Sequence, residues 1–190
     1  MNSFENYLKR FAKLRVDTSR TRWSPATQHC APHKPFLLMA IMDLFAQGTI
    51  TSNLIEMTPD LGEVFTIYWS KLMPAEHHAN LALPFFHLKS EGFWHLIPRS
   101  GKEDFLAYAR QIRSSGQLRD TIVGATLDEE LYEFLCVAET RDLLRAVLLK
   151  AYFADEVQEL LIQQSVINLK AFQYSQALLE GITQSIVKEQ

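Results

Sequence analysis

Residues 35–48 read PFLLMAIMDLFAQG, and the fold has to be built around this segment. Nearly all of its side chains are apolar, which is typical of a helix that is buried. Pro35 suits the first turn of a helix, where its missing N–H group is not needed, and glycine such as Gly48 often follows a helix end. The segment therefore predicts a buried helix from about Pro35 to Gly48.

Two prolines, Pro32 and Pro35, bracket His33 and Lys34 at the start of this helix. The first turn of a helix has free backbone N–H groups and the positive end of the helix dipole, so it favours an anion. A lone histidine at such a place is more often a capping or surface residue than a ligand. His33 and Lys34 are thus candidates for anion binding beside that simpler role.

The segment before this helix divides into a short helix and a polar loop. Apolar residues recur at helical spacing from Phe4 to Leu14, and Ser3 can cap that helix. Residues 16–31 are polar and contain a proline, so they predict a loop. This loop carries Arg20, Arg22 and Trp23.

The stretch 81–97 reads LALPFFHLKSEGFWHLI, with aromatic residues on both sides of a polar tip. Both halves are rich in β-favouring residues, and Gly92 can supply the positive φ of a tight turn. The stretch predicts a β-hairpin whose turn lies over residues 89–92. The aromatic side chains are better explained by core and hairpin packing than by ligand contacts; they are Phe85, Phe86, Phe93 and Trp94.

The other segments complete a mostly helical chain. A short strand or turn is predicted over residues 49–54, where Ser52 or Asn53 could cap a second helix over residues 59–72. Further helices are predicted over 102–113, 127–136, 138–153 and the C-terminal segment. Helix, short strand, helix and hairpin follow in the order of a winged-helix-like module. The predicted fold class is mainly α with a small β-hairpin: a winged-helix-like DNA-binding module followed by a helical C-terminal part.

Charge is distributed unevenly along a chain whose formal net charge is only -3. The first 125 residues hold 14 basic and 11 acidic residues, whereas the remainder holds 5 basic and 11 acidic residues. Seven basic residues and one acid lie between Lys9 and Lys34. Such a pattern can mark a polyanion-binding end, and the alternative is an ordinary solvated basic helix and loop.

Several classes of protein and site are not indicated by the sequence. Cys30 and Cys136 are far apart and form no CxxC pair, so a zinc framework is not predicted and a reduced, cytoplasmic protein is expected. No apolar run approaches the roughly 18 residues that span a membrane. Residues 76–80, EHHAN, lack the surroundings of an HNH nuclease motif, and no phosphate-binding loop or nucleophile elbow is present. We therefore expect no catalytic residues, metal or cofactor in this chain.

Four segments resemble one known family, the sulfur-binding domain of type IV, McrA-like HNH restriction endonucleases. They are APHKPFLLMAIMDLFAQGTI (31–50), PFFHLKSEGFWHLIP (84–98), ATLDEELYEFL (125–135) and RDLLRAVLLKAYF (141–153). The resemblance spans roughly residues 15–153. It implies a mainly helical domain with a small hairpin, which recognises phosphorothioate-modified double-stranded DNA and is commonly followed by an HNH nuclease domain.

The resemblance also implies a pocket for the sulfur atom. Leu83 and Pro84 lie where the family usually has Tyr-Pro, and His87 matches another pocket position. Leu83 removes the aromatic wall that the family tyrosine provides, unless Phe85 or Phe86 compensates for it. A proline ring and a leucine offer apolar surface to sulfur, which is larger and a weaker hydrogen-bond acceptor than oxygen. An oxygen pressed against such a wall would lose hydration without gaining a partner.

Basic residues would hold the phosphate in this interpretation. His33 and Lys34 match a His-basic pair that in the family faces the modified phosphate and neighbouring bases, and either Arg20 or Arg22 would be the loop arginine that reaches DNA.

The predicted organisation is a DNA-recognition domain over residues 1–170 and a connecting helix over 171–190. That helix would lead to an HNH nuclease domain, and the full-length protein is expected to be the enzyme, with a possible homodimer. The alternative is a winged-helix-like regulatory or protein-interaction domain that binds unmodified DNA or a protein partner. No membrane partner is expected.

Overall fold

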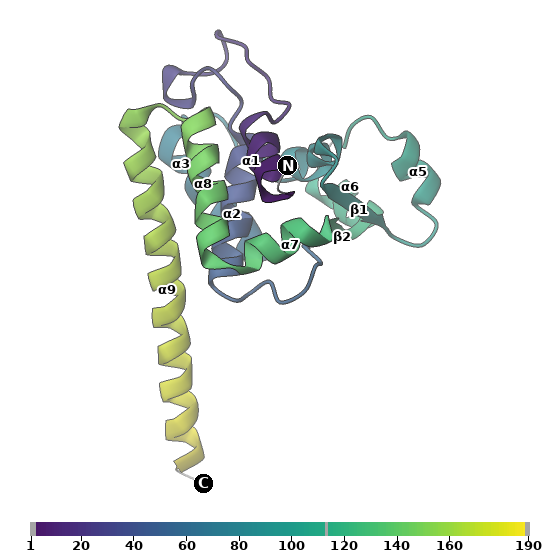
Figure 1. The fold of residues 1–190 in the computed structure, drawn as a ribbon. Coiled ribbons are helices and arrows are strands. Elements are labelled where there is room, and N and C mark those ends of the chain that lie inside the picture. The colour runs from purple at the N-terminus through teal and green to yellow at the C-terminus, as the bar shows by residue number, and fades with distance from the viewer. Residues whose placement is uncertain (1–2, 113, 189–190) are drawn as a thin grey trace.

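A computed structural model describes residues 3–112 and 114–188, with residues 183–188 described by their backbone alone. Helices dominate the chain, and two strands pair beside them (Figure 1). In chain order the elements are α1 (Ser3–Ala12), the 3-10 turn η1 (Pro25–Thr27), α2 (His33–Ala46), α3 (Pro59–Leu72), α4 (Ala82–His87), the 3-10 turn η2 (Leu88–Glu91), β1 (Trp94–Pro98), α5 (Glu103–Tyr108), α6 (Ser115–Thr121), β2 (Ile122–Leu127), α7 (Glu129–Cys136), α8 (Ala138–Tyr152) and α9 (Asp155–Lys188). The fold class, mainly α with a small antiparallel β element, is confirmed.

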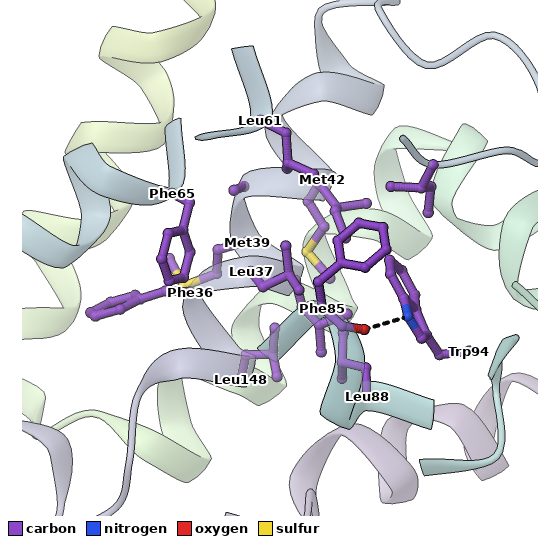
Figure 2. Close-up of a cluster of buried hydrophobic side chains, with 14 of the residues drawn as sticks. Phe36, Leu37, Met39, Met42, Leu61, Phe65, Phe85, Leu88, Trp94 and Leu148 are labelled. Atoms are coloured by element: carbon purple, nitrogen blue, oxygen red, sulfur yellow. Dashed lines mark hydrogen bonds between the residues drawn. The ribbon is translucent and has the colours of Figure 1, made fainter. Parts of the chain in front are cut away.

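Helix α2 is the centre of the core, as its apolar sequence predicts. Every residue from Lys34 to Phe45 is buried, and the helix packs against α3, α4, α7, α8 and α9. Figure 2 shows side chains of α2 between Leu61 and Phe65 of α3, Phe85 of α4 and Leu148 of α8. The helix begins at His33, two residues before the predicted start, because Pro32 already lies at its N-cap.

The hairpin predicted over residues 81–97 is wrong in its first half. Helix α4 and the turn η2 replace the first strand and the hairpin turn, and only β1 is a strand. The buried residues here are Leu81, Ala82, Pro84, Phe85, Phe86 and Leu88, and the less buried Leu83 and His87 lie four positions apart. A four-residue interval is the spacing of a helix, whereas in a strand every second residue would face solvent.

The role expected for the aromatic residues of this stretch is confirmed. Phe85, Phe86, Phe93 and Trp94 are each at most 1% exposed. The indole N–H of Trp94 donates to the Phe85 carbonyl oxygen at 2.8 Å, which joins β1 to α4 (Figure 2). Gly92 ends η2 with a φ of 75°, so the positive φ was predicted correctly although the turn is of another kind.

The strand that pairs with β1 is β2, which lies between the helices predicted over 102–113 and 127–136, where no element was predicted; only its last residue, Leu127, was predicted to be helical. Strand β2 follows α6 and runs antiparallel to β1, with Trp94 opposite Leu127 and Leu96 opposite Ala125. Helix α5 ends at Tyr108, so the helix predicted over 102–113 is shorter than expected. Ile55 forms one isolated antiparallel β-bridge with Ala125. This bridge directly follows residues 49–54, where a short strand or turn was predicted.

The helix caps in the structure also differ from the predicted ones. Thr58, not Ser52 or Asn53, caps α3, because its side chain accepts the Leu61 N–H at 3.2 Å. Asn53 instead exchanges two hydrogen bonds with the Leu127 backbone, each 2.9 Å long, and so ties the loop to the end of β2. The Ser3 hydroxyl donates to Glu130 of α7 rather than capping α1.

Helix α9 is 34 residues long and leaves the body of the protein in its second half (Figure 1). Its first half packs on α2, α3 and α8. Farther along, Tyr174, Leu178 and Ile182 are exposed. In the chain described here, none of the helices combines the length and the apolar character that crossing a membrane requires.

Candidate nucleic-acid interface

A concave pocket of about 400 Å³ lies where the loop after α1, the start of α2 and helix α4 meet. Six of the seven predicted site residues line it: Arg22, His33, Lys34, Leu83, Pro84 and His87. Arg20 is exposed and is not part of the lining. The structure thus brings together residues that are up to 65 positions apart in the chain.

Helix α4 explains why Leu83, Pro84 and His87 share one pocket. His87 lies three positions after Pro84 and four after Leu83, and residues three or four apart lie on one face of a helix; in a strand, residues 84 and 87 would point to opposite faces. Pro84 sits in the first turn, where its missing N–H group leaves no hydrogen bond unmade. The Asn80 side chain accepts the Ala82 N–H at 3.1 Å at the same helix end. Pro84 itself is buried, whereas Leu83 is 36% exposed.

His33 enters the pocket as an uncharged ring. Its centroid lies 4.6 Å from the Trp69 ring and 5.4 Å from the Trp23 ring. Burial lowers the pKa of the His33 imidazole to about 4, against the weaker opposing effect of the Asp17 carboxylate. The ring is therefore neutral at neutral pH.

His87 is the second imidazole of the pocket. Its pKa is lowered first by burial and then by the nearby positive charges of Lys34 and Lys89. Its ring packs edge-on against Phe86 at a centroid distance of 5.2 Å. Two neutral rings together with Leu83 and Pro84 give the pocket a weakly polar wall.

Lys34 is held inside the protein by three partners. Its ammonium group forms an ion pair with the Glu91 carboxylate and donates to the Arg15 carbonyl oxygen at 2.8 Å and the Ser90 hydroxyl at 3.2 Å. The side chains of Lys34 and Glu91 are only 8% and 6% exposed. Because an ammonium group has three N–H donors, this geometry uses all of them within the protein.

Arg22 is the loop arginine that reaches the pocket. Its guanidinium group lies 3.1 Å from the Asp17 carboxylate, and its side chain is 69% exposed. Asp17 also accepts the Trp23 indole N–H at 2.8 Å. This hydrogen bond, together with the Ser19 backbone N–H and the Arg22 charge, lowers the pKa of Asp17. The Asp17 carboxylate thus orients both the indole and the guanidinium group.

The loop itself is fixed at two further points. Gln28 and His29 have positive φ angles of 49° and 58°, which non-glycine residues adopt only where their surroundings hold them. The Gln28 side chain donates to the Phe153 carbonyl oxygen at 2.8 Å, and the Ala31 N–H donates to the Asp17 carbonyl oxygen at 2.7 Å. The loop is therefore an ordered part of the pocket.

Several pocket residues were not among the predicted site residues. They are Arg15, Val16, Asp17, Trp23 and Ala31. Trp23 stood out as the aromatic residue of a basic loop, but nothing local to the sequence indicates that it contacts His33. Across the residues whose placement is described, no group of three or more His, Cys, Asp or Glu side chains could hold a metal ion.

Comparisons with known proteins bear on the family and the fold of the chain. Residues 5–168 match the family model for the ScoMcrA-like DNA sulfur-binding domain. Among solved structures, the sulfur-binding domain of SprMcrA in complex with phosphorothioated DNA is similar in fold, with a TM-score of 0.58 and 16% sequence identity over 88% of this chain and 96% of that chain. No curated protein matches the chain significantly. The family match covers most of the sequence, and the chain belongs to the ScoMcrA-like family of DNA sulfur-binding domains.

Proposed function

We propose that this protein recognises phosphorothioate-modified double-stranded DNA and that the pocket beside Pro84 holds the sulfur atom. The observation that carries the proposal is the pocket lining. The lining combines Leu83, Pro84 and two neutral imidazoles with the guanidinium group of Arg22. Membership in the sulfur-binding family supports the same function.

The lining favours sulfur over oxygen for a physical reason. A non-bridging oxygen is a strong hydrogen-bond acceptor, and its removal from water without a partner costs about 1–3 kcal/mol. Sulfur accepts hydrogen bonds weakly and loses little hydration against Leu83 and the Pro84 ring. Selectivity then arises mainly because the pocket rejects the unmodified phosphate.

Arg22 supplies the attraction for the charged part of the linkage. Its exposed guanidinium group already lies in hydrogen-bonding geometry beside Asp17, so little ordering is needed when a phosphate arrives. Arg20 lies outside the pocket lining, so we assign the loop contact to Arg22. Lys34 acts from inside the protein, by holding the Arg15 carbonyl and Glu91 in place.

We further assign the chain to recognition and not to catalysis. The matches are to a DNA-binding domain, with no catalytic domain among them. In the larger protein, the second half of α9 would connect this domain to an HNH nuclease and so bring the nuclease to modified DNA. The family match ends at residue 168, which supports a division near residue 170. Helix α9 continues through this position without a break, as a connecting helix would. A homodimer of the larger protein remains part of this proposal.

The central test compares two duplexes that differ by one sulfur atom. We expect the protein to bind the phosphorothioated duplex at least tenfold more tightly than the plain duplex, which corresponds to about 1.4 kcal/mol. Fluorescence anisotropy at near-physiological salt measures both affinities. Equal affinities would contradict the proposed function.

A second test asks whether the sulfur atom lies against Pro84. Pro84→Ala removes part of the apolar wall and adds an N–H group that can donate to an oxygen, so the preference for sulfur should shrink by about 1–2 kcal/mol. Alanine suits a helix, so the variant should fold, and a thermal melt checks this. Pro59→Ala is the matched control, because Pro59 also begins a helix but lies outside the pocket. A folded Pro84→Ala protein with its full preference for sulfur would show that the pocket is elsewhere.

A further inference from the structure

A second concave surface adjoins the sulfur pocket on the side of α1. It has a volume of about 290 Å³ and is lined by Lys9, Arg10, Lys13, Arg15, Ser90 and Glu91; we refer to it as the α1 basic groove. Arg15 lines both the pocket and the groove, while Lys34 lines only the first and Glu91 only the second. The buried Lys34–Glu91 pair therefore stands between two adjacent sites.

The Glu91 carboxylate of the groove does not neutralise Lys13 or Arg15. The Glu91 carboxylate is held by the Lys34 ammonium group, the Ser90 hydroxyl and the Arg15 backbone N–H, and its side chain is only 6% exposed. Arg10 is also engaged, because it donates to Asp128 at 3.2 Å and to the Glu91 carbonyl oxygen at 2.9 Å. Within the described residues, no acidic side chain forms an ion pair with Lys13 or Arg15, and both are exposed.

Helix α1 and the residues directly after it form a fixed support for these cations. Its Phe11 is fully buried and stacks on Phe93 at a centroid distance of 5.3 Å. Its Tyr7 hydroxyl donates to Asp128 at 2.9 Å, and the Leu14 N–H just after the helix donates to the Tyr152 hydroxyl at 2.6 Å. Cations on a backbone that is held in this way lose little backbone entropy when they bind an anion.

From this arrangement we infer that the α1 basic groove binds a phosphodiester group of the DNA backbone next to the modified linkage. The inference rests on the proposed function, since the position of this phosphate is defined relative to the sulfur atom in the adjoining pocket. Contacts to backbone phosphates fix the position of a protein on DNA without reading its sequence. The groove would therefore strengthen binding on one flank of the modified linkage and leave the preference for sulfur unchanged.

The test combines a double variant with shortened duplexes. Lys9→Ala with Lys13→Ala should weaken binding to the thioated duplex by about fivefold to thirtyfold near 0.15 M salt, and should lower the slope of log affinity against log salt by about one to two. The same loss is expected for the plain duplex, so the ratio of the two affinities should stay constant. The matched control is Lys102→Ala with Lys170→Ala, which removes two exposed lysines from the start of α5 and from α9.

Two thioated duplexes, each shortened on one side of the sulfur, test the position of the contact. The wild-type protein should lose affinity on one of them only, and on that duplex the Lys9/Lys13 variant should bind as well as wild type. A variant that matches wild type on the full duplex would overturn the inference. An equal loss on all three duplexes would overturn it as well, because it would mean a long-range charge effect. The wild-type preference for sulfur is measured in the same series, so a failure of the proposed function would be visible separately.

Discussion

Asp43→Ala is expected to lower the free energy of unfolding by about 3–5 kcal/mol, because it leaves a buried guanidinium group without its counter-charge. The Asp43 side chain is 1% exposed and lies 2.7 Å from the Arg145 guanidinium group, whose side chain is 9% exposed. The same carboxylate accepts hydrogen bonds of 2.7 Å each from Tyr68, Ser165 and Asn168. One side chain of α2 thus joins α3, α8 and α9.

Urea unfolding followed by circular dichroism measures this loss. Asp142→Ala is the matched control, since Asp142 is exposed on α8, and we expect its effect to stay within about 0.5 kcal/mol. The double change Asp43→Leu with Arg145→Met removes both charges and should be more stable than Asp43→Ala alone. A loss below about 1 kcal/mol for Asp43→Ala would show that this network does not hold α9 to the core.

Lys34→Ala should likewise destabilise the protein by about 3–5 kcal/mol, because the Glu91 carboxylate would remain buried without its ammonium partner. The pair also organises the pocket, since Lys34 and Glu91 both bond the backbone of Arg15. We therefore expect weaker DNA binding as a consequence of altered structure, with the salt dependence of binding by the folded protein little changed.

This result would separate two roles for Lys34. A lysine that contacts a phosphate would reduce the salt slope by about one when removed, with little effect on stability. The double change Lys34→Met with Glu91→Leu removes both buried charges and should recover much of the lost stability. Lys71→Ala serves as the control for the loss of one exposed lysine on α3. A stable Lys34→Ala protein with a reduced salt slope would contradict the buried-pair role.

Sequence patterns predicted the helices well wherever composition or spacing was strong. The apolar run of α2 required burial on all sides, and the helical spacing up to Leu14 predicted α1, which ends two residues earlier at Ala12. The error over residues 81–91 arose because aromatic residues favour strands, although the apolar residues of this segment have helical spacing. Strand β2 was missed since a strand is stabilised by its partner, and the paired residues lie 24 to 33 positions apart in the chain, from Pro98↔Ile122 to Trp94↔Leu127.

Resemblance to a family identified six residues of the pocket, but it could not describe their surroundings. It left open whether Arg20 or Arg22 serves the site, and only Arg22 lines the pocket of the folded protein. It assigned Lys34 to the phosphate, whereas folding pairs this lysine with Glu91, 57 positions later. The residues next to Arg22 and Lys34 in the sequence do not determine these roles. Each role depends on which side chain from a distant part of the chain lies beside it in the folded protein.

The sequence by itself determined the mainly helical class, the buried α2 helix, and the placement of His33 and Lys34 at its start, because these follow from apolar content and helix-end chemistry. Tertiary structure alone decided that Pro84 and His87 of α4 line one pocket with the start of α2, and that Trp23 stands against His33. It also decided which cations remain exposed to an anion and which are neutralised inside the protein. The physical reason is that charge pairing and desolvation act over a few ångströms in space, and chain positions far apart come within that range only after folding.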